Sequence, residues 1–121
     1  AVHVRGGDIV GPGRAFFERA LVRMEKERPG LRYLVFTNDK EAAKEALEGE
    51  HTERKMTYIS ELGAFSDVDE FFLMAACRHQ IISNSSYSTW AAYLNPNPEK
   101  VVIMPEYKGC EQIRLKEWIV L

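Results

Sequence analysis

Residues 77–94, with the sequence CRHQIISNSSYSTWAAYL, decide the fold prediction. A short apolar run, Ile81-Ile82, precedes a polar loop, and a helical pattern rich in aromatic residues begins at Thr89-Trp90. The loop between them consists of Ser83, Asn84, Ser85, Ser86, Tyr87 and Ser88. Hydroxyl groups and the unpaired N–H groups of a helix start bind anions, usually phosphate, because the helix dipole is positive there. We therefore predict a phosphate-binding loop at the end of a buried strand.

Strand and helix patterns alternate along the whole chain. Apolar and branched runs predict strands at residues 1–5, 31–37, 57–59, 80–83 and 101–104. Helices are predicted at 14–28, at 40–48, from Ser66-Asp67 onward and at 89–94, with a last short helix or turn at 111–118. This alternation is typical of an α/β fold with a parallel sheet between two helical layers. We predict one Rossmann-like three-layer α/β/α domain over residues 1–121, with five parallel strands in the order 3-2-1-4-5.

The predicted strand order brings two polar segments together. The first and fourth strands are neighbours where the winding of the sheet reverses, and ligands bind there, outside the carboxyl ends of the strands. The first strand runs into His3-Val4-Arg5-Gly6-Gly7-Asp8, and the fourth runs into the serine-rich loop. We therefore expect both segments to line one crevice.

Composition narrows the class of protein. The chain has 121 residues, of which 45% are hydrophobic and 28% charged, as is ordinary for a globular domain. Its net charge of −2 argues against a nucleic-acid partner. No apolar run approaches the roughly 20 residues that cross a bilayer, so no direct membrane insertion is expected from this segment. The two cysteines, Cys77 and Cys110, neither demand nor exclude a disulfide.

Several common ligand motifs are missing from the sequence. It contains no GxGxxG, no GxxxxGK[ST] and no Cys/His cluster with metal-ligand spacing. The triplet Asp67-Val68-Asp69 has the pattern of a helix cap rather than of a metal site. We therefore expect no metal cofactor, and the charge of a phosphate would have to be met by Arg5, His3 and backbone N–H groups.

Arg5 and His3 are the charged and polar candidates on the first strand. Two glycines after Arg5 let a ligand approach the backbone, and a guanidinium offers a planar fork for phosphate oxygens. Alternatively, Arg5 pairs with a surface carboxylate such as Asp8. His3 is two residues from Arg5, so both side chains can point to one face of the sheet.

Other polar residues have both a capping and a binding interpretation. Thr37, Asn38 and Asp39 end the second strand at the same edge, where they contact a ligand or cap the next helix. At the start of the third helix a carboxylate, Asp67, Asp69 or Glu70, either suits the helix dipole or accepts two hydrogen bonds from a guanine edge. Trp90 and Tyr93 have helical spacing and are interpreted as core residues.

At these residues the chain resembles the α-1,2-fucosyltransferase family, within the GDP-fucose-dependent fucosyltransferases. Residues 3–8 resemble the family's His-x-Arg-Arg-Gly-Asp motif, and residues 34–39 are similar to its second strand. Residues 72–77 and 81–94 resemble its most specific segment, a serine-rich loop that runs into Trp-Ala-Ala-Tyr-Leu. Glu117-Trp118 is similar in placement, so the resemblance covers nearly the whole chain in the same order.

The resemblance implies the C-terminal, GDP-fucose-binding half of a GT-B glycosyltransferase that inverts the anomeric centre without a metal. An N-terminal half would supply much of the acceptor site. Arg5 would stabilise the departing diphosphate, His3 would hold the diphosphate or ribose, and Ser85, Ser86 and loop N–H groups would take the remaining phosphate oxygens. Asp8 would assist as an acid or base. Transfer of fucose to a glycan hydroxyl, α-1,2 to galactose, is the implied reaction.

Two positions depart from the family pattern. Gly6 stands where the family has a second arginine, and Glu70 aligns with a family aspartate, with Asp69 one residue earlier. The loss of a charge at Gly6 favours an alternative, a nucleotide-sugar-binding module without transferase activity. If the site is instead that of a weakened transferase, Gly6→Arg should improve donor affinity. A purely structural domain docked on a partner is a third possibility, and it predicts no binding of GDP.

Overall fold

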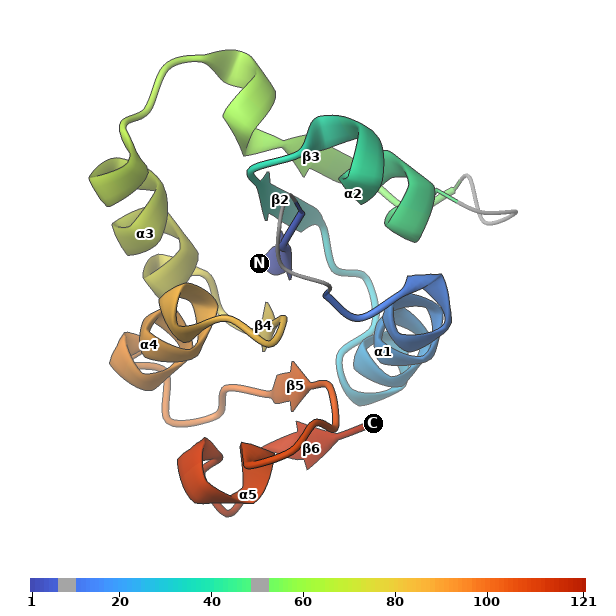
Figure 1. Cartoon of the computed structure of the whole chain (residues 1–121), viewed down its shortest axis with the longest axis vertical. Coiled ribbons are helices and arrows are strands. Elements are labelled where there is room, and N and C mark those ends of the chain that lie inside the picture. Colours follow the sequence, from blue (N-terminus) through green and yellow to red (C-terminus); the bar gives the residue numbers. More distant parts are fainter. Residues whose placement is uncertain (7–10, 49–52) are drawn as a thin grey trace.

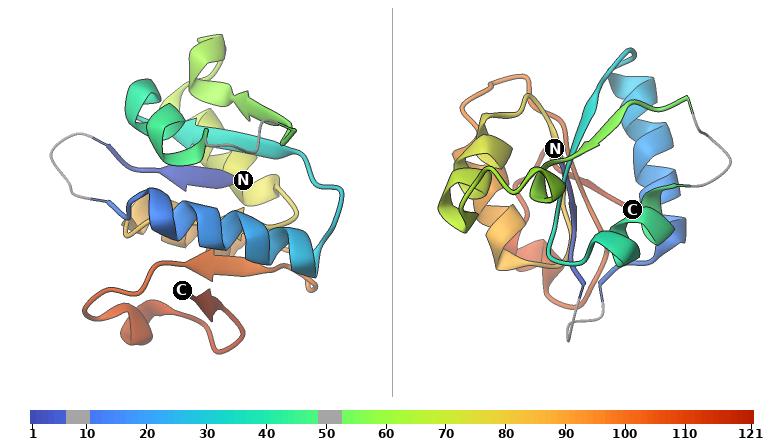
Figure 2. Two further views of the ribbon diagram at one scale, coloured as in Figure 1. Left: turned by 90° about the vertical axis from the view of Figure 1, so that its right-hand side faces the viewer. Right: turned by 90° about the horizontal axis from the view of Figure 1, so that it is seen from above.

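The structure is a computed structural model that describes residues 1–6, 11–48 and 53–121. In this part of the chain six strands form one parallel sheet in the order β3-β2-β1-β4-β5-β6. The strands are β1 (Val2–Val4), β2 (Tyr33–Thr37), β3 (Met56–Tyr58), β4 (Gln80–Ile81), β5 (Val102–Met104) and β6 (Ile119–Val120). The helices are α1 (Arg14–Glu27), α2 (Lys40–Leu47), the 3-10 helix η1 (Ile59–Leu62), α3 (Asp67–Ala76), α4 (Ser86–Leu94) and α5 (Cys110–Ile113). Figures 1 and 2 show α1 and α2 on one face of the sheet and α3 and α4 on the other.

The predicted three-layer parallel fold is confirmed, and its strand count was wrong. The order 3-2-1-4-5 is present, but β6 extends the sheet beside β5. The sequence of the tail was interpreted as a helix or turn because only two residues of β6 pair, which is too short for a periodic pattern. α4 also begins three residues earlier than predicted, at Ser86, because the serines belong to its first turn.

Side-chain caps begin two of the helices as their sequences predict. The Asp39 carboxylate accepts a hydrogen bond from Ala42 N at 3.1 Å and starts α2. Ser66 and Asp69 form a capping box at the start of α3, in which each side chain binds the other residue's backbone N–H. These contacts satisfy N–H groups that have no partner inside the helix.

Alternation along the strands divides the core between the two faces. Val2 and Val4 pack with the buried residues of α1 and α2, so His3 between them faces α3 and α4. Phe36 likewise packs against Met74 and Ala91 on the α3 and α4 side. A polar side chain on the middle strand is therefore directed toward the layer that contains the serine-rich loop.

The far end of α4 is fixed by a buried polar network. Asn95, which is 4% exposed, donates to Arg78 O at 3.0 Å and to Gln80 Oε1 at 2.9 Å. Lys100 Nζ donates to Ala92 O and Asn95 O at 2.8 and 3.1 Å, at the carbonyl end of the helix. These hydrogen bonds hold the last turn of α4 beside the start of β4. The first turn of α4 lies at the other edge of the sheet, where the strands have their carboxyl ends.

The prediction that Trp90 belongs to the core was wrong, because its side chain is 59% exposed. Tyr93 stacks on the buried Trp118 with ring centroids 5.0 Å apart, as a core residue would. Cys77 and Cys110 are free thiols. None of the described helices combines the length and the apolar composition needed to cross a bilayer.

Candidate functional site

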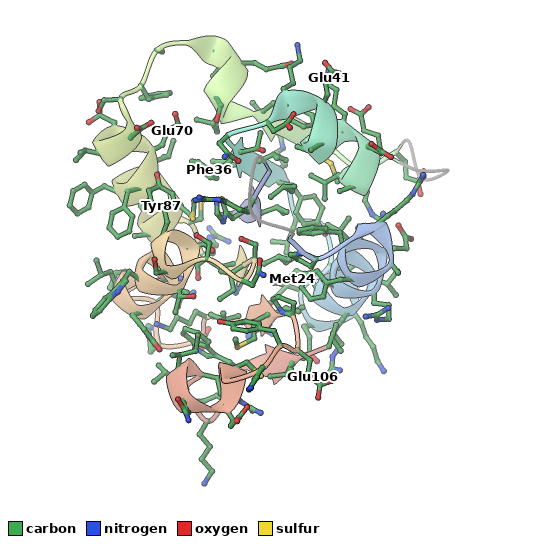
Figure 3. All side chains as sticks on the ribbon, viewed as in Figure 1. Met24, Phe36, Glu41, Glu70, Tyr87 and Glu106 are labelled. Carbon is green, nitrogen blue, oxygen red and sulfur yellow. The ribbon has the colours of Figure 1, made fainter. Side chains whose placement is uncertain are left out.

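A cavity of about 470 Å³ lies at the carboxyl ends of β1 and β2, beside α3 and the first turn of α4. It is lined by His3, Arg5, Phe36, Thr37, Asn38, Ser60, Asp67, Glu70 and Tyr87. Figure 3 shows Glu70, Phe36 and Tyr87 close to one another in this region. The cavity is next to the point between β1 and β4 where the winding of the sheet reverses. Ligands of open parallel sheets bind at this place.

His3 is buried in the wall of the cavity. Its Nδ1 lies 2.8 Å from Ser83 Oγ, and its ring centroid lies 5.6 Å from that of Tyr87. Burial, together with the positive charge of Arg5, lowers the pKa of His3 from 6.5 to about 4. The imidazole is therefore neutral near pH 7, and Nε2 is the ring nitrogen left for a ligand.

Arg5 provides a cation at the same wall. Its Nε is buried and has no hydrogen-bond partner among the described residues. An unsatisfied buried donor is costly, so Arg5 Nε is a candidate contact for a ligand. Asp8, the alternative partner and the candidate acid or base, lies outside the described residues.

Asn38 fixes the backbone that follows Arg5. Its Oδ1 accepts from Gly6 N at 2.7 Å and its Nδ2 donates to Gly6 O at 3.3 Å.

A Cβ at Gly6 would lie 2.4 Å from Asp39 Cβ, so the two strand ends touch there. The absence of a side chain at Gly6 thus has a packing cause, and Gly6→Arg would not fit this space. The expectation that it restores donor affinity is replaced by the opposite one.

Glu70 of α3 and Tyr87 of α4 line the side of the cavity that the helices form. Glu70 Oε1 accepts a hydrogen bond from Ser60 Oγ at 2.8 Å, which orients the carboxylate. The Tyr87 hydroxyl donates to Asp67 O at 3.0 Å and joins α4 to the start of α3. Burial, with the charges of Glu70 and Asp67, raises the pKa of Tyr87 to about 12. Tyr87 therefore stays a neutral hydrogen-bond donor.

The serine-rich loop has a different arrangement from the one expected. Ser88 Oγ accepts from Ser83 N and donates to Ser85 O, and Thr89 Oγ1 donates to the same carbonyl at 2.8 Å. Asn84, Ser85, Ser86 and Ser88 are not among the residues that line the cavity. Ser85 is the N-cap of α4, and among the described residues no side chain caps this helix start, where the first backbone N–H groups have no partner inside the helix.

The loop nevertheless lies beside the end of β1. β1 and β4 are paired through Val2 and Ile81. A Cβ on Gly11 would lie 3.0 Å from Arg5 O and 3.8 Å from Asn84 Oδ1. The two predicted segments are therefore at the same edge of the sheet.

Six predicted ligand residues line the cavity, and they come from four separate elements or their ends. They are His3, Arg5, Thr37, Asn38, Glu70 and Tyr87. Asp69 is not among them, because it caps α3. Phe36 and Ser60 line the cavity but were not proposed as ligand contacts from the sequence, and Asp67, one of the three carboxylates considered for a guanine edge, lines it as well. Phe36 has the pattern of a core residue, and only the fold brings Ser60 next to Glu70.

A second cavity of about 470 Å³ lies at the opposite edge of the sheet, around residues 31–34 and 77–79. It is largely apolar, and it lies at the amino ends of the strands, where parallel sheets do not bind ligands. Among the described residues no three His, Cys, Asp or Glu side chains gather as metal ligands. The binding of a diphosphate without a metal stays a prediction.

The buried His3 should make stability depend on pH. The folded pKa of about 4 lies below the ordinary 6.5, so the stabilisation is present above pH 6.5 and is lost as the pH falls toward 4. We expect this residue to contribute a loss of about 2 kcal/mol in unfolding free energy between pH 7.5 and 5. Urea unfolding at each pH measures this contribution as the difference between the wild type and His3→Gln. The comparison is needed because other groups such as His79 contribute to the pH dependence of both proteins. Equal pH slopes in the two proteins would contradict the burial of His3.

Comparison with known proteins identifies the family of the chain. Residues 1–121 match the family model described as Glycosyl transferase family 11. The chain is 29% identical over 117 residues to the O-antigen biosynthesis glycosyltransferase WbnK of Escherichia coli. That alignment covers 87% of this chain and 37% of the relative, so the chain spans well under half of the relative's length. No solved structure matches the chain significantly. Because the family match extends over the complete sequence, the protein belongs to glycosyl transferase family 11.

Proposed function

We propose that this chain is the donor-binding domain of an inverting fucosyltransferase that transfers fucose from GDP-fucose to a glycan hydroxyl, α-1,2 to galactose. The observation that carries the proposal is the buried Arg5 Nε, which has no partner in the part of the chain that the structure describes, beside a cavity at the switch point of a parallel sheet. A glycan acceptor and an N-terminal half that binds it are part of the proposal, because the related WbnK is much longer than this chain.

The leaving group explains why Arg5 is needed. When the bond between fucose and GDP breaks, negative charge grows on the β-phosphate. A fixed guanidinium aimed at that oxygen stabilises the transition state more than the ground state. The N–H groups at the start of α4 supply a second positive end. Two such donors account for a diphosphate site that requires no metal ion.

Glu70 is the group best suited to a guanine base. The edge of guanine carries two neighbouring N–H donors, and a carboxylate accepts both. Ser60 holds Oε1 in place, while Phe36 and Tyr87 give the cavity aromatic walls against which a base can lie. Uracil has no such pair of donors, so the site should prefer guanine to uracil nucleotides.

Calorimetric titration of the chain with GDP, GDP-fucose, GDP-mannose and UDP tests these assignments. We expect GDP and GDP-fucose to bind and UDP to bind at least tenfold more weakly. Glu70→Gln should remove most of this preference, because an amide replaces one accepting oxygen with a donor. Asp69→Asn, one residue away at the helix cap, is the matched control and should keep the preference. Tighter binding of UDP than of GDP would exclude the guanine assignment.

A nucleotide-sugar-binding module without transferase activity remains the second candidate. The observation in its favour is the single motif arginine, since Gly6 carries no charge. The two candidates differ in turnover, because only a transferase releases GDP from GDP-fucose in the presence of a galactoside. Binding of GDP-fucose without turnover by the full-length protein would favour the module.

A further inference from the structure

We propose that Ser83 is a positioning residue that sets the tautomer of His3, so that the imidazole presents Nε2–H to the cavity as a neutral donor to a diphosphate oxygen. The choice of a diphosphate as the ligand rests on the proposed function. The tautomer itself follows from contacts within the chain and can be tested without any ligand.

The contact between Ser83 and His3 is short and excluded from solvent. Ser83 Oγ lies 2.8 Å from His3 Nδ1. Ser83 is 0% exposed and His3 is 5% exposed. The residues are 80 positions apart in the sequence, and they meet because Ser83 follows β4 and β4 pairs with β1. Either atom can donate in such a pair, depending on the tautomer.

The surroundings of Ser83 decide which atom donates. Among the described residues, Nδ1 of His3 is the hydrogen-bond partner of the Ser83 hydroxyl. If Nδ1 carried the proton, the hydroxyl would accept it, and its own O–H would be buried without an acceptor. Such a group is costly. When Ser83 donates to Nδ1 instead, both atoms are satisfied, and the single proton of the neutral ring lies on Nε2.

Burial is the main reason why the His3 ring stays neutral. The charge of Arg5, which follows the end of β1, disfavours a second positive charge and acts in the same direction. The carboxylates that border the cavity, Asp67 and Glu70, belong to α3, and Tyr87 of α4 is uncharged near pH 7. Arg5 therefore supplies the positive charge, and His3 supplies an oriented N–H group.

Nitrogen-15 NMR of the free protein measures the tautomer directly. In the wild type we expect His3 Nε2 to be protonated and Nδ1 to be the accepting nitrogen between pH 6 and 8. In Ser83→Ala we expect the two tautomers to mix, because the hydroxyl that selects one is gone. A protonated Nδ1 in the wild type, or an unchanged tautomer in Ser83→Ala, would overturn the assignment.

Binding measurements test the link to the diphosphate. We expect Ser83→Ala to weaken GDP binding about tenfold and to leave guanosine binding unchanged, because guanosine has no phosphate. His3→Gln, whose amide reaches the place of Nε2, should retain more GDP affinity than His3→Asn, whose shorter amide replaces Nδ1. Thr57→Ala removes an exposed hydroxyl on β3 and should change neither affinity.

The two sets of measurements separate the possible failures. An equal loss of GDP and guanosine affinity in Ser83→Ala would place the contact on the nucleoside or make the effect structural, and either result overturns the diphosphate contact. If the wild type binds no nucleotide, the proposed function fails, while the NMR measurement still decides the task of Ser83.

Discussion

Replacing Arg5 with methionine is expected to abolish GDP binding and to leave the free protein at least as stable as the wild type. The guanidinium supplies charge-assisted hydrogen bonds to the diphosphate, and each is worth about 1.5–3 kcal/mol. Loss of two such bonds corresponds to a decrease in affinity of more than about 100-fold. Methionine keeps the length of the apolar stem and removes Nε, which is buried without a partner among the described residues.

Calorimetry with GDP and thermal unfolding of the free protein together measure this prediction. Arg19→Met, on the exposed side of α1, is the matched control and should change neither quantity. Arg5→Lys should bind with intermediate affinity, because an ammonium keeps the charge and loses the planar fork. A large loss of stability in Arg5→Met with unchanged GDP affinity would make Arg5 a structural residue and remove it from the mechanism.

Gly6→Ala should destabilise the fold by about 3 kcal/mol, an unusually large effect for one added methyl group. The new Cβ would lie 2.4 Å from Asp39 Cβ, where no side-chain rotation relieves the overlap. Asp39 caps α2 and Asn38 binds the Gly6 backbone, so separation of the strand ends disturbs both contacts. Gly6→Arg should be at least as damaging, although it matches the family motif.

Urea unfolding measures the effect, with Gly13→Ala as the matched control. A Cβ on Gly13, the N-cap of α1, meets nothing within 4 Å, so that variant should lose at most about 1 kcal/mol, because alanine caps a helix less well than glycine. If Gly6→Ala were as stable as Gly13→Ala, the close approach of β1 and β2 would not exist in solution. Higher GDP affinity in Gly6→Arg would instead support a site weakened by a missing charge.

Local sequence patterns predict how some of the polar residues are oriented. Alternation places His3 opposite the apolar Val2 and Val4, and the structure confirms that these two valines pack on α1 and α2. The caps at Ser66 and Asp39 also follow from local rules, because a capping side chain reaches a backbone N–H only three residues away.

Contacts between distant residues depend on the tertiary structure. The parallel α/β order and the edge of the sheet where the candidate cavity lies were predicted from the sequence, since periodicity and strand ends are local properties. It did not determine that Ser83 meets His3, that Ser60 orients Glu70, or that Gly6 touches Asp39. Those pairs are 10 to 80 residues apart. Their geometry follows from strand register and from how closely two chain ends pack, and neither is encoded in any single segment.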